Sequence, residues 1–421
     1  MLRGGSFRAG FVLAAIALAS AAPSLAGEGA AAPWHAVDAD TGQIRDVEGL
    51  KALAEAFPDS SSVRLRLLNA QLGVEDFEGV LASLSWLKQR GYVFSETAQG
   101  QIPELVGETF AARARALLIQ KAETIEASEV VATVPAEAGL VEGLFAPESD
   151  NVLLATSITG NSLHLFEPEN GWSDARIPGA NDLSGIVSEP DNSMGWIASA
   201  NLDGSEDESG LFTGLIGLTG DIDNPILVPA PEGAAVSDLT ISGDATVYAS
   251  DPLNGGIYRK PVGATELEVF IAPGTFRSPQ GLALSADDKR LYVSDYRYGL
   301  AIIDLTSGEV RRLSSDVPVI LDGTDALFRH GNDLIAIQNG TSPVRISAFT
   351  LSENGTRIIA ARVLEQAHPG WTEPLGGSIA HGALYYVATG QWDRFVKGEP
   401  AADKPAIPTE IRRLALSAPP D

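Results

Sequence analysis

The sequence predicts a mainly β fold, a six-bladed β-propeller, preceded by a small α-helical region. Six similar stretches support this prediction, since each opens with a short polar or acidic step and continues through two apolar strands joined by a turn. The steps fall at residues 142, 184, 238, 280, 325 and 376, so successive repeats begin 42, 54, 42, 45 and 51 residues apart. Short strands that recur roughly every 40–50 residues are typical of a propeller with one four-stranded sheet per blade.

A propeller brings the equivalent position of every blade to one ring around a central channel. The opening steps place Glu142, Asp238, Gln280 and Asp325 at such positions. Because the residue at this position differs between blades, these four side chains are the first candidates for a functional site.

Residues 1–26 resemble a secretory signal peptide. Arg3 and Arg8 precede an apolar run from Phe11 to Ala22, which is too short to span a bilayer. We expect cleavage after Ala26, at the small-x-small pattern of residues 24–26, with residues 20–22 as a rival site. The prediction is a periplasmic or secreted protein with no membrane span in the mature chain, and an uncleaved anchor is the alternative.

The composition excludes several classes of partner and site. The chain has 55 acidic and 29 basic side chains and a net charge of −26, so we expect neither nucleic acid nor an anionic membrane as a partner. It has no cysteine, which excludes thiolate metal sites and cysteine nucleophiles.

Helical periodicity appears before the first repeat. Residues 27–44 are rich in Ala and Gly and are predicted to form a flexible lead-in, and residues 45–126 to form the helical region. Apolar spacing and capping residues predict four helices: from about Val47 to Pro58, over residues 63–72 with caps in Ser60–Ser62, from Asp76 to near Gly91, and over Thr109–Glu123.

The stretch "LRLLNAQLGVEDFEGVLASLSWLKQRGY" resembles a tetratricopeptide helix pair. A single repeat of this type must bury its apolar face on a neighbour. The helical region is therefore expected to lean on the propeller as a cap, or to dock a protein partner.

The propeller is predicted to span residues 127–417. Strands are expected at Glu129–Val134 and at Glu410–Leu416. Pairing the two chain ends in one blade removes the exposed edges of the ring, so both strands are predicted to belong to blade six.

Residues 278–313, "SPQGLALSADDKRLYVSDYRYGLAIIDLTSGEVRRL", closely resemble a blade of the gluconolactonase/regucalcin (senescence marker protein) family. The run "VEGLFAPESDNVLLATSITGNSLHLF" is similar to its first blade. The pieces "DGTDALFRHGNDLIAIQNG", "EPLGG" and "YYVATGQWDRF" resemble an exported bacterial branch of that family.

The resemblance implies one divalent cation at the channel mouth, with ligands from the opening steps of several blades. Glu142 and Asp325 match the acidic ligand positions of the family. Asp238 and Gln280 stand where the family has Asn, which departs from its ligand pattern.

The residues themselves suggest a similar site. Three carboxylates facing one mouth repel each other, so either a cation neutralises them or one of them takes up a proton. With the amide oxygen of Gln280 the set is all oxygen, which suits Ca²⁺, Mg²⁺ or Mn²⁺. Such an ion can polarise a lactone carbonyl, and Asp325 or Asp322 can act as general base. The alternative is that the polar steps only satisfy turn amides, and Asp322-Gly323 in particular fits a turn.

These observations leave three functions open. The leading one is a periplasmic metal-dependent hydrolase of a small lactone or ester, resembling gluconolactonase. A non-catalytic propeller scaffold with a protein-docking helical region is the alternative. A quinone-dependent sugar dehydrogenase shares the blade count but is disfavoured by the scarcity of suitably placed histidines. Four aromatic residues are expected either to line the channel mouth or to fill gaps between blades: Tyr296, Tyr298, Trp371 and Trp392.

Overall fold

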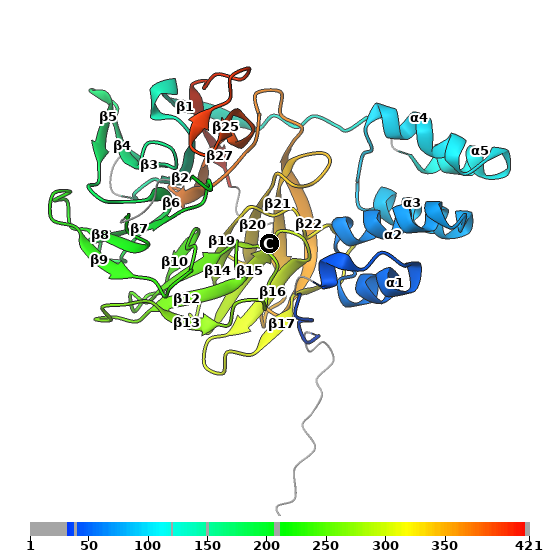
Figure 1. Ribbon diagram of the computed structural model, residues 1–421, viewed down its shortest axis with the longest axis horizontal. Coiled ribbons are helices and arrows are strands. Elements are labelled where there is room, and N and C mark those ends of the chain that lie inside the picture. Colours follow the sequence, from blue (N-terminus) through cyan, green and yellow to red (C-terminus); the bar gives the residue numbers. More distant parts are fainter. Residues whose placement is uncertain (1–31, 38–39, 119–120, 149–150, 206–210, 417–421) are drawn as a thin grey trace, which may run out of the picture. The chain divides into compact units, whose positions relative to one another are not determined.

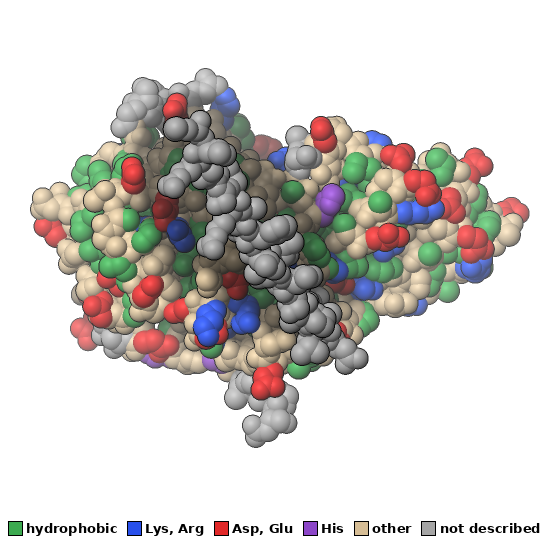
Figure 2. Space-filling model, turned by 90° about the horizontal axis from the view of Figure 1, so that it is seen from below, with side chains coloured by type: hydrophobic (Ala, Val, Ile, Leu, Met, Phe, Trp, Pro, Cys, Tyr) green, Lys and Arg blue, Asp and Glu red, His purple; other side chains and the backbone are tan. Residues whose placement is uncertain are grey.

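The computed structural model describes residues 32–416 except 38–39, 119–120, 149–150 and 206–210. The predicted signal peptide, residues 1–26, lies outside the described residues. Within the described part, no helix is both long enough and apolar enough to cross a bilayer. Figure 2 shows acidic side chains distributed over the visible face rather than gathered in one patch, as expected for charge that interacts mainly with solvent.

The predicted six-bladed propeller is confirmed (Figure 1). Blade one contains β2 (Val141–Phe145), β3 (Leu153–Ser157), β4 (Ser162–Glu167) and β5 (Gly171–Arg176). Blade two contains β6 (Asp182–Ser188), β7 (Gly195–Ala200), β8 (Gly214–Leu218) and β9 (Ile226–Pro229). Blade three contains β10 (Leu239–Ile241), β11 (Val247–Asp251), β12 (Gly256–Lys260) and β13 (Glu268–Ile271).

Blade four is β14 (Pro279–Leu284), β15 (Arg290–Asp295), β16 (Gly299–Asp304) and β17 (Val310–Arg312). Blade five is β19 (Ala326–His330), β20 (Asp333–Gln338), β21 (Arg345–Leu351) and β22 (Arg357–Gln366), with the short β18 (Ser314–Ser315) added in parallel to β22. A small hairpin, β25 (Phe395–Val396) and β26 (Glu399–Pro400), follows the 3₁₀ turn Trp392–Arg394.

Blade six joins the two ends of the described chain, as predicted. It contains β23 (Gly377–Ala380), β24 (Ala383–Val387), β27 (Thr409–Ala415) and, outermost, β1 (Ser128–Val134). The strands β1 and β27 are antiparallel, with Glu129 opposite Arg413. The fully buried Glu365 carboxylate secures the start of β1, because it accepts hydrogen bonds from the Ser128 amide at 3.0 Å and the Tyr386 hydroxyl at 2.8 Å.

Five α-helices precede the propeller in the described part of the chain. They are α1 (Val47–Ala56), α2 (Ser61–Gly73), α3 (Phe77–Gln89), α4 (Glu96–Leu105) and α5 (Glu108–Leu117). The predicted caps are confirmed, since Ser60 accepts from the Val63 amide and Asp76 from the Gly79 amide. Helix α4 was not predicted, because Gly100 and Pro103 are poor helix formers and interrupt the short helical pattern of its apolar residues.

The helical region packs on blades four and five. Phe57 stacks on Tyr298 with ring centroids 4.7 Å apart, and both belong to one apolar cluster with residues of α1 and α2. Beside them, Asp59 pairs with Arg90 at 3.5 Å and with Arg312 of blade four at 3.8 Å. These contacts confirm the expectation that the helical region leans on the propeller, whereas the apolar cluster of α2 to α5 forms within the helical region itself.

The lead-in also contacts the blades where the structure describes it. The Trp34 indole donates to the Thr275 carbonyl at 3.0 Å, and Val37 is only 1% exposed. The described part of the lead-in therefore packs against its neighbours, and flexibility of the lead-in stays a prediction. Val37 is buried among residues of α1 and α2 and Tyr298, and the half-buried Trp34 packs beside Phe57 and Phe276.

Candidate functional site

The opening steps lie where the innermost strands begin. The pairing of the first two strands shifts register at this step in three blades, between Val141 and Leu144, between Leu183 and Ile186, and between Pro279 and Leu282. Such a bulge redirects the side chain at the shift.

In three blades a glycine follows the step and lies against the next blade: Gly143, Gly185 and Gly281. A Cβ atom on Gly281 would lie 2.2 Å from the Leu327 nitrogen, and one on Gly143 would lie 2.2 Å from the Ser184 oxygen. The polar-glycine step therefore combines a bulge with a close approach of backbones that only glycine permits.

Four carboxyl groups gather at this end of the channel, and we call Glu142, Asp238, Asp325 and Glu373 the carboxylate cluster. Burial and the negative charges of Asp325 and Asp238 raise the pKa of Glu142 well above its ordinary value. Burial and the charges of Asp238 and Glu373 likewise raise the pKa of Asp325. The structure thus brings the three predicted carboxylates close enough to repel each other.

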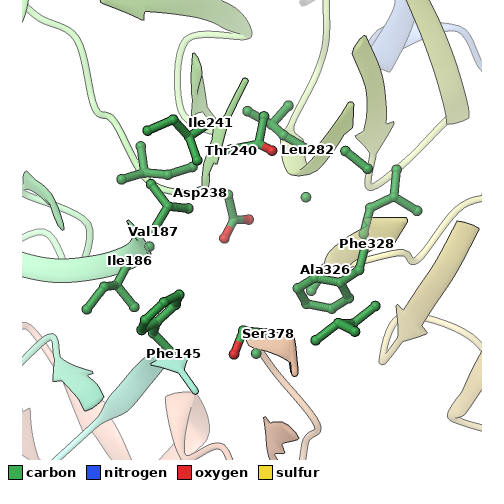
Figure 3. A pocket seen from close by; sticks show the side chains of 18 of the residues that line it. Phe145, Ile186, Val187, Asp238, Thr240, Ile241, Leu282, Ala326, Phe328 and Ser378 are labelled. Atoms are coloured by element: carbon green, nitrogen blue, oxygen red, sulfur yellow. The ribbon is translucent and has the colours of Figure 1, made fainter. Parts of the chain in front are cut away.

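Asp238 differs from its neighbours because nothing in the described chain hydrogen-bonds its carboxyl group. Figure 3 shows this group pointing into the channel. The channel has a volume of about 340 Å³, and its wall includes the apolar side chains of Phe145, Ile186 and Phe328. Burial raises the pKa of Asp238 to about 7. A carboxyl group without a hydrogen-bond partner in such a channel favours binding of a cation or a hydrogen-bond donor.

Two hydrogen-bonded side chains hold the other carboxyl groups. The Trp392 indole nitrogen donates to Glu142 Oε2 at 2.8 Å. Asn339 hydrogen-bonds Asp325, and this contact opposes the rise in the pKa of Asp325. The Asn339 amide is itself fixed, because it accepts from the Tyr296 hydroxyl at 2.9 Å and donates to the Pro374 carbonyl at 3.1 Å.

Sequence reasoning missed two members of this site, Glu373 and Asn339. Both lie in segments that the family resemblance quoted, but neither occupies an opening step. Asn339 follows the second strand of blade five, as Tyr296 follows that of blade four. Comparing the residue after every second strand would have pointed to Asn339 and Tyr296 but not to Glu373. Of the four aromatic candidates, Tyr296 and Trp392 contact this site through hydrogen bonds.

The structure shows no contact between Gln280 and the carboxylate cluster. Its amide nitrogen donates to the Ser278 hydroxyl at 3.3 Å, and the side chain is half-buried. The role of Gln280 as a ligand stays a prediction.

Asp322 has a different role from the predicted general base. Its carboxylate is fully buried and accepts from the Ser61 and Ser62 amides, each at 2.7 Å, and from the Ser61 hydroxyl at 3.0 Å. Both oxygens are thus used at the N terminus of α2, where a negative charge is favourable. This position corrects the catalytic assignment of Asp322, because the carboxylate anchors the helical region.

The carboxylate cluster fits a divalent cation in the type of its ligand atoms but does not form a preformed site. Among the described residues, no three His, Cys, Asp or Glu side chains converge closely enough to form a ready-made metal site. The donor chemistry nevertheless fits a hard cation, since Glu142, Asp238 and Asp325 offer only oxygen and carry mutually repelling charges.

No family model matches the chain, and no curated protein matches it. Among solved structures it is similar to a gluconolactonase from Xanthomonas campestris, at 14% identity and a TM-score of 0.47, over 70% of this chain and 96% of that one. It is similar to a virginiamycin B lyase from Staphylococcus aureus, at 18% identity and a TM-score of 0.45, over 66% and 80%. It is also similar to an aldose sugar dehydrogenase from Streptomyces coelicolor, at 15% identity and a TM-score of 0.44, over 69% and 99%. The neighbours therefore include gluconolactonases together with a lyase and a dehydrogenase, and they do not distinguish among these reactions.

Proposed function

We propose that this chain is a periplasmic hydrolase of a small lactone or ester, with its active site at the carboxylate cluster. The observation that supports it most is the electrostatic repulsion among Glu142, Asp238 and Asp325, together with the Asp238 carboxyl group, which points into the channel and has no hydrogen-bond partner in the described chain. Carboxyl groups with raised pKa values at the mouth of a cavity are frequent in acid–base catalysis.

Asp325 is the general base of this proposal. Its raised pKa makes the ionised form a stronger base than an ordinary aspartate, and Asn339 holds the group in place. Asp325 takes a proton from water as the water oxygen bonds to the carbonyl carbon. It then returns the proton to the ring oxygen when the carbon–oxygen bond breaks, so the product is a hydroxy acid.

We further propose that a divalent cation, Ca²⁺, Mg²⁺ or Mn²⁺, assists this reaction. Glu142, Asp238 and Asp325 would hold it, with Gln280 as a fourth ligand. When bound, such an ion neutralises the repelling carboxylates and polarises a carbonyl group. Trp392 contributes by fixing one oxygen of Glu142 through its indole hydrogen.

The proposal is tested with the purified protein, metal analysis and a panel of sugar lactones and aryl esters. Adding Ca²⁺, Mg²⁺ or Mn²⁺ after EDTA treatment should raise the melting temperature, because a cation at about 100 times its Kd stabilises the folded state by about 2.7 kcal/mol. Glu142→Gln should abolish that shift, and Asp325→Asn should lower kcat by at least about 100-fold.

Asp174→Asn is the matched control, since Asp174 is an exposed carboxylate on β5 of blade one. A thermal shift that survives in Glu142→Gln would exclude the proposed ion site. Absence of hydrolysis across the panel would favour the alternative proposal, a non-catalytic binding scaffold whose helical region docks a protein. Protein capture with and without residues 27–126 tests that alternative.

A further inference from the structure

A second hollow lies outside the channel and is rich in arginine. It has a volume of about 740 Å³ and is lined by the end of the lead-in, by α1 and α2, and by two loops of blade four. We call its polar residues the arginine pocket: Arg45, Arg66, Asn69, Arg277, Arg297 and Tyr298. None of the residues that line it is Asp or Glu. Four guanidinium groups without a carboxylate are unexpected in a chain of net charge −26.

One buried carboxylate fixes the two arginines of blade four. Asp295 is fully buried and accepts from the Arg277 amide at 2.6 Å and from the Arg297 amide at 3.0 Å. It also accepts from the Tyr298 amide at 3.2 Å. Asp295 therefore fixes the backbone positions of Arg277, Arg297 and Tyr298, whose side chains line the hollow. Because this backbone is already ordered, less conformational entropy is lost when a ligand binds.

Hydrogen bonds to backbone carbonyls hold the guanidinium group of Arg66, which belongs to helix α2. One terminal nitrogen of Arg66 donates to the Thr41 carbonyl at 3.0 Å and the Ile44 carbonyl at 2.9 Å. Its other terminal nitrogen lies 3.5 Å from the Tyr298 hydroxyl. These contacts use three of the five N–H groups of the guanidinium and leave the remaining donors for a ligand.

The charges in this pocket lack counter-ions. In the described chain, Arg277 and Arg297 make no ion pair, and both side chains are exposed. By contrast, Arg90 and Arg312 nearby share the Asp59 carboxylate. Like charges gathered in one hollow repel each other, and a multiply charged anion relieves that repulsion while accepting forked hydrogen bonds.

We propose that the arginine pocket binds a small oxyanion with at least two negative charges, either a phosphate group or a dicarboxylate. The planar forked donors of arginine suit both chemistries, and a pocket of this size admits the anion together with an organic body. This site is separate from the carboxylate cluster and does not depend on any hydrolytic activity.

The experiment uses the full chain and two probes, inorganic phosphate and succinate, with sodium chloride at matched ionic strength. Titration calorimetry and melting temperature are expected to show saturable binding of at least one probe and no saturable effect of chloride. Binding of phosphate alone would indicate a phosphate ligand, and binding of succinate would indicate a dicarboxylate.

Arg277→Gln and Arg297→Gln each remove one guanidinium that makes no ion pair in the described chain, and each should weaken binding at least tenfold. Arg176→Gln, at an exposed position on β5, is the matched control and should leave the affinity unchanged. Asp238→Asn in the channel should also leave it unchanged, which separates this site from the proposed active site. The proposal would be overturned if both probes behaved like chloride, or if both pocket variants bound the probes as tightly as the unmodified protein does.

Discussion

Trp392 donates its indole hydrogen to Oε2 of Glu142 at 2.8 Å, so a loop of the last blade holds a side chain of the first. This bond favours the ionised carboxylate and opposes the effect of burial on the pKa of Glu142. Removing it in Trp392→Phe should raise that pKa further. Cation-induced thermal stabilisation, measured against pH, should then require a higher pH than in the unmodified protein.

Trp172→Phe is the control for this change. The Trp172 indole nitrogen is buried without a hydrogen-bond partner in the described chain, so its removal leaves every carboxylate as it was. Equal pH midpoints in Trp392→Phe and the unmodified protein would show that the indole does not tune Glu142.

The raised pKa of Asp238 leads to a prediction of how the stability of the protein depends on pH. Burial raises its pKa to about 7 in the folded state, above the value of an aspartate in an unfolded chain. The folded state therefore binds this proton more tightly, and the stability gained below the unfolded pKa is lost as the pH rises through 7. Without divalent cations, Asp238→Asn and the unmodified protein should melt at similar temperatures at or below about pH 4, and the variant should melt higher at about pH 8. A difference in melting temperature that does not change with pH would contradict this assignment.

The close packing at Gly281 leads to a prediction about the stability of a variant with a larger side chain there. A Cβ on Gly281 would lie 2.2 Å from the Leu327 nitrogen, so Gly281→Ala must separate blades four and five. We expect a loss of about 1–3 kcal/mol in the free energy of unfolding, measured by urea denaturation. Gly195→Ala on β7 is the control, because its nearest neighbour would be the Val187 oxygen at 3.8 Å. Equal effects of the two substitutions would argue against the close approach.

Substitution of Asp322 is expected to lower the stability of the protein rather than its catalytic activity. Asp322→Asn removes the charge at the N terminus of α2 and places an amide hydrogen donor against backbone donors of Ser61 and Ser62. The free energy of unfolding should fall by about 2 kcal/mol or more. Hydrolysis per folded molecule should stay unchanged. A large fall in kcat at unchanged stability would restore Asp322 as a catalytic residue.

The sequence was sufficient for the blade count, the closure of blade six and the position of the acidic steps. These features depend on local patterns that recur along the chain, such as a polar or acidic step at the start of an apolar strand. Glu373 and Asn339 were missed because neither lies at the opening step that the repeats share. The contact of Asp322 with Ser61 was not predictable either, since it joins residues far apart in the chain and leaves no periodic pattern.

The pairing of β1 with β27 also has a consequence for how the chain is made. The second strand of blade six ends with Val387, but its next neighbour begins only at Thr409. Until β27 has been synthesised, β1 lacks its pairing strand and one edge of β24 stays bare. A chain cut before Thr409 is therefore left with an open, adhesive sheet edge, which makes such a fragment prone to aggregate.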